Sequence, residues 1–312
     1  MNKIKVILSI FIILVIITGG GFYWKWYTLH HAEVVIEPDV WAIAEQQNKK
    51  NQPSEANSQV NILILGTDNR GDEVARSDTI MFVTANVDTH KVSIISIPRD
   101  TRVDIPGVGL TKINHANAVG EMRGGVHEGT LESTRAVSNF LGVPINYYIK
   151  IDFQGFAKAI DAVGGIDVTL PYPVNDNRIQ LAAGTHHLNG DQALRFSRVR
   201  YGLPNGDFDR QRDQFMLLSV LAQRMLSLSN IAKLPEVINI VYNELMDTNM
   251  SAAKIAAMGL EFKGIAKEDI QYYQLPGRGI SAQDPLVGAP VYYFEPDLDG
   301  VKAVVKQAIK PD

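Results

Sequence analysis

The longest uninterrupted apolar stretch of the chain lies close to its amino terminus. Residues 6–24 contain no charged side chain and consist mainly of Ile, Leu, Val and Phe. This length is about what a helix needs to cross the apolar core of a bilayer. Aromatic residues gather at its far end, where an aromatic belt would meet the membrane interface: Phe22, Tyr23, Trp24, Trp26 and Tyr27. The pattern predicts a transmembrane anchor over residues 6–27.

A cleaved signal peptide is the alternative for this stretch. An uncleaved anchor is favoured, because the apolar run is long and lacks an A-x-A-like cleavage site. The short basic tail, residues 1–5, mildly favours a cytoplasmic amino terminus. The remaining chain would then lie outside the cytoplasm, held at the cell membrane by a single span. Within residues 28–59, the segment 46–59 is almost free of apolar side chains, which predicts a stalk before a folded domain at 60–312.

From residue 60 onward, strand-like and helix-like patterns alternate. Short β-rich runs lie at 60–65, 79–87, 92–97, 147–151 and 166–170, with further short strands over 270–294. Helical periodicity covers 130–141, 153–163, 209–228, 234–244, 252–262 and 298–309. A turn at 88–91 joins two of the strands in a predicted hairpin. The alternation predicts an α/β fold, a three-layer α/β/α sandwich around a central mixed sheet.

Composition narrows the possible functions. The 312-residue chain has no cysteine, which excludes disulfides, thiolate metal sites and a cysteine nucleophile. Its formal net charge of -4 argues against general nucleic-acid binding, which usually needs a broad basic face. The sequence contains neither a GxxxxGK[ST] phosphate loop nor a GxSxG nucleophile elbow.

Arginines are concentrated between residues 193 and 214, in contrast to the acidic average of the chain. They are Arg195, Arg198, Arg200, Arg210 and Arg212. The planar guanidinium stays protonated and matches phosphate oxygens bidentately. The cluster therefore predicts a polyanion or pyrophosphate site. A solvated helix face with i,i+4 ion pairs explains this stretch equally well on its own.

Charged residues also follow the ends of predicted strands. Asp68, Asp78 and Arg99 occupy such positions, where α/β folds usually form their ligand crevice. The two carboxylates could converge on Mg²⁺, which proteins hold with one or two carboxylates plus substrate phosphates. Taken singly, each aspartate is better explained as a cap or turn residue. His115 suggests a general base, but a hydrogen-bonding structural role is favoured for a lone histidine in a loop.

Several motifs occur in a specific order. They are RSDTI at 76–80, SIPRDT at 96–101, KINHA at 112–116, the D-F…V-G-G-I-x-V segment at 152–168, LNGDQAL at 188–194, R-x-R at 198–200 and DFDRxxxQ at 207–214. Together they resemble the LytR–CpsA–Psr family over about residues 61–226. The short tail, single span and polar stalk also resemble the membrane topology of that family.

The resemblance implies a phosphotransferase on the outer face of the membrane. Such enzymes move a glycopolymer, for example teichoic acid or capsule, from a polyprenyl-pyrophosphate carrier to peptidoglycan through a phosphodiester. By their places in these motifs, Asp68 and Asp78 match the acidic positions that the family associates with Mg²⁺. The pyrophosphate-binding set is Arg76, Arg99, Lys112, Arg198, Arg200, Arg210 and Gln214. Arg99, Asp100 and Asp207 are the expected catalytic residues, and either aspartate could accept a proton from the incoming sugar hydroxyl.

One departure from the family pattern concerns the arginine motif. The family often has R-x-x-R-Q, whereas Asp213 precedes Gln214 here and the nearest arginine is Arg212. If Arg212 points away, another residue must supply its phosphate contact. The polyprenyl tail also needs an apolar slot, which the helix face with Phe215, Leu218 and Met225 could line; core packing is the alternative role for that face.

Two other functions fit the same residues. A non-catalytic or regulatory protein could use the arginines to hold polyprenyl phosphates or anionic wall polymers. The paired aspartates favour the enzyme, because a simple anion binder gains nothing from carboxylates beside its arginines. A hydrolase that trims pyrophosphate would differ only in using water instead of a sugar hydroxyl as the attacking group.

Overall fold

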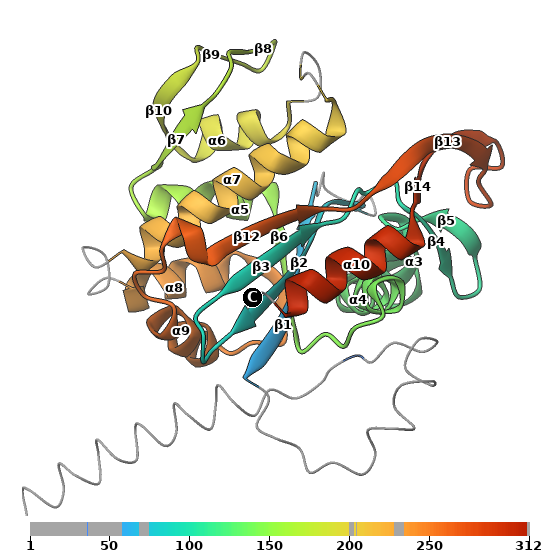
Figure 1. The fold of residues 1–312 in the computed structure, drawn as a ribbon, viewed down its shortest axis with the longest axis horizontal. Coiled ribbons are helices and arrows are strands. Elements are labelled where there is room, and N and C mark those ends of the chain that lie inside the picture. The colour runs from blue at the N-terminus through green and yellow to red at the C-terminus, as the bar shows by residue number, and fades with distance from the viewer. Residues whose placement is uncertain are drawn as a thin grey trace, which may run out of the picture.

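The computed structural model describes residues 36, 58–68, 75–199, 203, 205–227 and 234–310 (Figure 1). The expected tail at 1–5, the expected anchor at 6–27 and Arg200 lie outside these residues. Within the described part, no helix combines the length and the apolar character needed to span a bilayer. The division of the chain into anchor, stalk and folded domain therefore stays a prediction.

A mixed β-sheet of six strands forms the centre of the described part, in the order β11-β6-β1-β2-β3-β12. Its strands are β1 (Gln59–Thr67), β2 (Ser77–Asn86), β3 (Val92–Ser96), β6 (Tyr147–Asp152), β11 (Leu245–Thr248) and β12 (Ile270–Gln274). β2 runs antiparallel to β1 and β3, whereas β6 is parallel to β1 and β12 is parallel to β3. The predicted hairpin is confirmed as β2–β3, and the predicted mixed central sheet is confirmed.

Helices cover both faces of this sheet (Figure 1). One face carries α3 (His115–Gly124), α4 (Val126–Leu141) and α10 (Leu298–Ile309); the other carries α5 (Phe153–Ala162), α7 (Asp207–Leu226), α8 (Leu234–Asn243) and α9 (Ala252–Glu261). Successive side chains of a strand point to opposite faces. Leu63 accordingly packs with α4 and α10, while Ile62 packs with α9. Burial on both faces explains the unbroken apolar run of β1.

Shorter elements surround the sheet. They are β4 (Arg102–Ile105), β5 (Gly109–Lys112), β7 (Ile166–Leu170), β8 (Val174–Asp176), β9 (Ile179–Leu181), β10 (Gly184–Leu188), α6 (Gly190–Ser197), the 3₁₀ turn η2 (Lys267–Asp269), β13 (Gly277–Gln283) and β14 (Pro290–Pro296). A further apolar core joins β7, β8 and β10 to α5, α6 and α7. Strands β13 and β14 form a hairpin that projects from the body beside β4 and β5 (Figure 1).

Strand register brings the charged residues to one edge of the sheet. Thr67 at the end of β1 lies opposite Ser77 at the start of β2. Met81 of β2 lies opposite Ser96 at the end of β3. The residues that follow β1, begin β2 and follow β3 are consequently neighbours. Away from this edge, Ile36 forms a bridge with Ile145, through backbone hydrogen bonds of 3.2 and 3.0 Å.

Candidate active site

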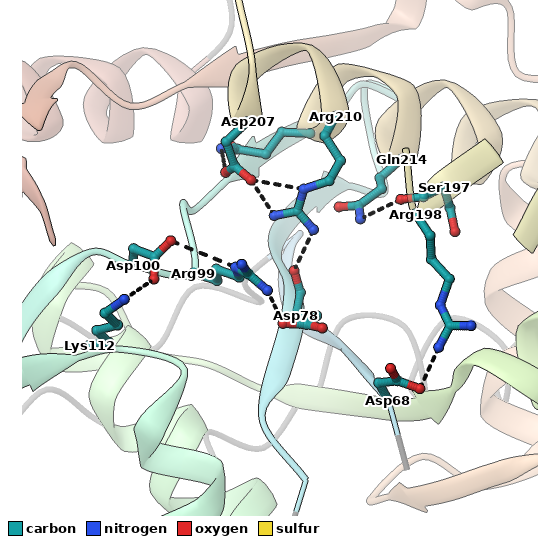
Figure 2. Close-up of polar contacts among 11 residues, drawn as sticks. Asp68, Asp78, Arg99, Asp100, Lys112, Ser197, Arg198, Asp207, Arg210 and Gln214 are labelled. Carbon is teal, nitrogen blue, oxygen red and sulfur yellow. Dashed lines mark hydrogen bonds and ion pairs between the residues drawn. The ribbon is translucent and has the colours of Figure 1, made fainter. Parts of the chain in front are cut away.

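Two arginine–aspartate pairs form the centre of the site (Figure 2). Arg99, just after β3, donates from Nη1 to Asp78 Oδ1 at 2.5 Å. Arg198, which caps the end of α6, donates from Nη2 to Asp68 Oδ1 at 2.5 Å. Burial by itself would lower the pKa of Arg99, but the charge and hydrogen bond of Asp78 outweigh it and raise that pKa. The guanidinium of Arg99 therefore stays charged.

The first turns of α7 supply the other wall of the site. Arg210 is buried and donates from Nε to Asp207 Oδ1 at 2.8 Å, and its Nη1 lies 3.5 Å from the backbone oxygen of Asp78. Gln214 is one helical turn further on and donates to the backbone oxygen of Ser197 at 3.2 Å. Because residues four apart share a helix face, Arg210 and Gln214 point into the same space.

A polar cavity of about 140 Å³ lies between these walls. Its lining consists of Asp68, Asp78, Phe153, Arg178, Ser197, Arg198, Arg210 and Gln214. The structure thus brings together in one cavity five of the residues predicted from sequence, which come from both ends of the motif series. Three guanidinium groups and two carboxylates leave an excess of one positive charge, which attracts an anionic group and balances half of the charge of a dianion.

Arg99, Asp100 and Lys112 continue the site on one side (Figure 2). Lys112 Nζ donates to Asp100 Oδ1 at 2.6 Å, and Asp100 Oδ2 lies 3.7 Å from Arg99 Nε. In Figure 2, Arg99 lies between Asp100 and Asp78, while Ser197 and Gln214 lie on the far side of the cavity. The polar residues therefore form a row that extends beyond the cavity itself.

Two apolar cavities continue the site in the other direction. The smaller one, about 70 Å³, shares Phe153, Ser197 and Gln214 with the polar cavity. The larger one, about 290 Å³, shares Ile64 and Leu218 with the smaller one. The larger cavity lies between the sheet and helices α7, α8 and α9, and apolar side chains dominate its lining.

The helix face expected to line an apolar slot is divided between two roles. Leu218 and Met225 do line the larger cavity. Phe215 instead stacks on Tyr272, with ring centroids 4.2 Å apart and an interplanar angle of 20°. Both interpretations of this face, cavity wall and core packing, are therefore realised on the same helix.

Several predicted positions lie away from the polar cavity. Arg76 is exposed and is absent from the cavity lining. Arg195 is exposed and pairs with Asp191 at 2.9 Å, consistent with a structural role. Arg212 turns outward and pairs with Asp209 at 3.3 Å, and Asp213 is buried beside it outside the cavity. Asp213 stands where the family often has its second arginine, and Arg212 points outward. This wall of the cavity therefore lacks the second guanidinium of the motif.

Arg178 supplies a guanidinium that the sequence analysis did not identify. It lies in the turn between β8 and β9, lines the polar cavity, and donates to the backbone oxygen of Arg198 at 3.2 Å. Asp176 Oδ1 lies 3.4 Å from the same nitrogen. The strands on either side are too short for a periodic pattern, so the only sequence signal is an arginine in a turn.

Phe153 is the second residue that the sequence analysis missed. It follows β6, and the guanidinium carbon of Arg198 lies 4.6 Å from the centre of its ring. An aromatic face attracts a cation and holds a planar guanidinium parallel or tilted above it. Phe153 therefore helps to orient Arg198 toward Asp68.

His115 is a structural residue. It begins α3 instead of lying in a loop, is 3% exposed, and its Nδ1 lies 2.7 Å from Thr111 Oγ1. Burial and the nearby charge of Arg76 lower its pKa. The hydroxyl of Thr111 also donates a hydrogen bond to the buried carboxylate of Asp284. This bond ties the β13–β14 hairpin to β5.

The carboxylates of the site bear on whether it could hold Mg²⁺. No group of three or more His, Asp or Glu side chains in the described ranges is arranged to hold a metal ion. Asp68 and Asp78 nevertheless both face the polar cavity. Two carboxylates suffice for Mg²⁺, which usually completes its shell with water and substrate phosphates.

Comparison with known proteins places the chain among close relatives. A family model described as the LytR_cpsA_psr family matches residues 34–310. A Bacillus cereus protein named polyisoprenyl-teichoic acid–peptidoglycan teichoic acid transferase TagU is 35% identical over 288 residues, covering 91% of this chain and 89% of its own. The TagU of Bacillus subtilis is 29% identical over 304 residues, covering 96% and 93%.

Solved structures agree with the fold. The crystal structure of B. subtilis TagV has a TM-score of 0.68 and 32% identity, covering 81% of this chain and 98% of that chain. A structure described as TagT bound to LIIa-WTA has a TM-score of 0.65 and 25% identity, covering 89% of this chain and 98% of its own.

Proposed function

The chain belongs to the LytR–CpsA–Psr family, as its motifs predicted, and we propose that it transfers a glycopolymer from a polyprenyl-pyrophosphate carrier to peptidoglycan. The names of the TagU relatives support a teichoic acid as the polymer and peptidoglycan as the acceptor. The structure described as TagT bound to LIIa-WTA supports a donor that carries a wall teichoic acid. We also propose the expected membrane anchor, with the folded domain outside the cytoplasm.

The adjacency of the polar and apolar cavities, which share lining residues, carries the proposal. The donor combines a charged pyrophosphate with a long isoprenoid chain, so its site must change from polar to apolar over a short distance. Ser197, Gln214 and Phe153 line both the polar and the smaller apolar cavity. Leu218 and Ile64 connect the latter to the larger apolar cavity. The pyrophosphate fits beside the arginines, and the isoprenoid fits between the sheet and α7.

The chemistry requires charge stabilisation more than covalent catalysis. The acceptor hydroxyl oxygen attacks the phosphorus that carries the polymer, and a new oxygen–phosphorus bond forms. The bond from that phosphorus to the bridging oxygen breaks, and polyprenyl phosphate leaves with the electron pair. Arg198, Arg210 and Arg178 surround the space for the two phosphates and oppose the charge that develops on them.

Asp100 is better suited than Asp207 to accept the proton of the hydroxyl. Asp207 Oδ1 is held by Nε and Nη2 of Arg210, at 2.8 and 2.5 Å, and its Oδ2 accepts from Gln211 at 2.9 Å. Asp100 accepts from Lys112, while its Oδ2 lies 3.7 Å from Arg99 Nε, beyond hydrogen-bond distance. One oxygen of Asp100 thus remains suitable for the incoming hydroxyl.

Mg²⁺ dependence is part of the proposal. Asp68 and Asp78 would hold the ion, which would neutralise phosphate charge and polarise the phosphorus–oxygen bonds. Arg198, the partner of Asp68, would then move toward the phosphates, because it lines the same cavity.

The decisive experiment incubates the full-length protein in detergent with a synthetic lipid-linked donor and peptidoglycan oligomers, with and without Mg²⁺. We expect a phosphodiester-linked product that requires Mg²⁺ and is lost in Arg198→Ala and Arg99→Ala. Normal turnover by both variants would refute the site. Donor binding without product would support the non-catalytic binder, and release of phosphate-ended polymer in the absence of acceptor would support the hydrolase.

A further inference from the structure

The two ends of the polar row face different surroundings (Figure 2). Ser197 and Gln214, at one end, also line the apolar cavity proposed for the isoprenoid. Asp100 and Lys112 lie at the opposite end, beyond Arg99. In phosphoryl transfer the attacking and leaving oxygens are roughly in line on opposite sides of the phosphorus. If the carrier leaves toward Gln214, the acceptor must approach from the side of Asp100.

Strand β14 borders this approach. The backbone nitrogen of Phe294 donates to the backbone oxygen of Asp100 at 2.9 Å, and Phe294 forms a bridge with Thr101. The Phe294 ring meets Phe208 edge-on, with centroids 5.9 Å apart. Phe208 directly follows Asp207 at the start of α7. β14 is thereby fixed beside both acidic residues.

Tyr292 is the exposed aromatic residue on the same face of β14. It lies two positions before Phe294, so the two side chains share a strand face. Phe294 is 3% exposed, whereas Tyr292 is 57% exposed. Burial first, and then the charges of Asp100 and Asp207, raise the pKa of the Tyr292 hydroxyl, which agrees with a position near both carboxylates.

A glycine on the neighbouring strand sets the orientation of this ring. A Cβ added at Gly279 would lie 2.8 Å from Tyr292 Cε2 and 3.2 Å from its hydroxyl oxygen. The Tyr292 ring therefore lies across the hairpin, where only a glycine leaves space for it. One side of the ring faces Gly279, and the side chain as a whole stays exposed.

We propose that Tyr292 forms an acceptor subsite with Asp100, in which a pyranose ring of the peptidoglycan glycan packs on the tyrosine ring and presents its hydroxyl to the carboxylate. The subsite rests on the proposed transferase function. The weakly positive C–H groups of a sugar face are attracted to the negative face of an aromatic ring. Lys112 adds a donor at the same end, while Phe208 and Phe294 hold the strand in place.

The test uses the full-length protein in detergent with a lipid-linked donor and a tetrasaccharide of alternating N-acetylglucosamine and N-acetylmuramic acid. Tyr292→Ala is expected to raise the acceptor KM about tenfold or more, with kcat at saturating acceptor and donor KM nearly unchanged, because only acceptor binding is weakened. Tyr292→Phe and Tyr292→Trp should retain the acceptor KM of the parent. Gly279→Ala should also raise it, because the added methyl displaces the ring.

Leu286→Ala, at an exposed apolar position in the loop of the same hairpin, is the control and should leave both KM values unchanged. Binding of the tetrasaccharide alone is measured in parallel by saturation-transfer NMR. An unchanged acceptor KM in Tyr292→Ala would overturn the subsite while leaving the transferase intact. If the parent protein binds the tetrasaccharide through Tyr292 but transfers nothing, the subsite stands and the transferase function fails. Tetrasaccharide binding that does not depend on Tyr292 would overturn the subsite in either case.

Discussion

The guanidinium carbon of Arg198 lies 4.6 Å from the centre of the Phe153 ring, while its Nη2 donates to Asp68. Asp152 caps α5 by accepting from the backbone nitrogen of Gly155 at 2.7 Å. That cap fixes the point at which β6 becomes a helix, and so it places Phe153 beside the end of β1. A residue without any charge thus contributes to the geometry of the phosphate site.

Replacing Phe153 by Leu should weaken donor binding without removing a charge. A cation–π contact of about 1 kcal/mol corresponds to a rise in donor KM of roughly fivefold. Initial rates at varied donor concentration measure the effect. Phe140→Leu, on the opposite face of the sheet, controls for general loss of packing. A donor KM in Phe153→Leu equal to that of the control would contradict the orienting role.

Arg178→Ala should raise the donor KM by roughly tenfold to a hundredfold, since a hydrogen bond to a charged group contributes about 1.5–3 kcal/mol. The increase in donor KM should be smaller than that caused by Arg198→Ala, because the latter variant also removes the ion pair with Asp68. Arg195→Ala is the matched control, as this exposed arginine lies on α6 outside the cavity. Equal donor KM values for the Arg178 and Arg195 variants would show that the β8–β9 turn plays no part in binding.

Much of the site could be predicted because the relevant signals are local. Asp68, Asp78 and Arg99 each flank an apolar run, and the alternation of strands and helices predicted that these runs share one sheet. The position of Arg212 could also have been derived from helix geometry. At about 100° per residue, Arg210 and Gln214 share a face, while Arg212 points to the opposite side.

The remaining parts of the site depend on tertiary contacts that no local pattern encodes. Arg178 reaches the cavity because a hairpin with strands of three residues packs over α6. β14 carries Tyr292 to the side of the site where Asp100 lies, because Phe294 on the same strand pairs with the residues after β3, far away in the sequence. The contact of Phe153 with Arg198 likewise requires knowing where α6 ends. Periodicity identifies elements, but it does not specify which of them meet.

The raised pKa of the buried Asp213 should make the free energy of unfolding depend on pH. Burial first, and then the charge of Asp209, raise its pKa to about 7, whereas the unfolded chain titrates near 3.8. Between these values the folded state binds the proton more tightly, so stability falls as pH rises from about 4 to about 7 and then levels off. The cost at pH 8 is up to about 4 kcal/mol.

Asp213→Asn removes this titration. Thermal unfolding of the full-length protein at pH 5 and pH 8 should show a larger gain in melting temperature for the variant at pH 8. Asp104→Asn, at an exposed position of β4, should show no such difference between the two pH values. A gain for Asp213→Asn that is equal at both pH values would mean that Asp213 is already ionised at pH 5 in the folded protein.

The ion pair between Lys150 and Glu121 should stabilise the folded state close to the site. Lys150 is fully buried on β6 and donates from Nζ to Glu121 Oε1 at 2.6 Å and to Asn117 Oδ1 at 2.8 Å. Glu121 Oε2 accepts from the backbone nitrogen of Ala75 at 3.2 Å, close to Asp78. Lys150→Met leaves Glu121 without its cationic partner, which typically costs about 3–5 kcal/mol.

The melting temperature of Lys150→Met should therefore fall by roughly 6–12 °C, as measured by thermal unfolding of the full-length protein. Lys158→Met is the matched control, because Lys158 pairs with Glu244 at a similar distance of 2.8 Å but is 61% exposed. Exposed pairs contribute little, since water and salt screen them. The control should lose less than about 2 °C. Equal losses in the two variants would show that burial adds nothing to the Lys150–Glu121 pair and that the segment at Ala75 is held by other contacts.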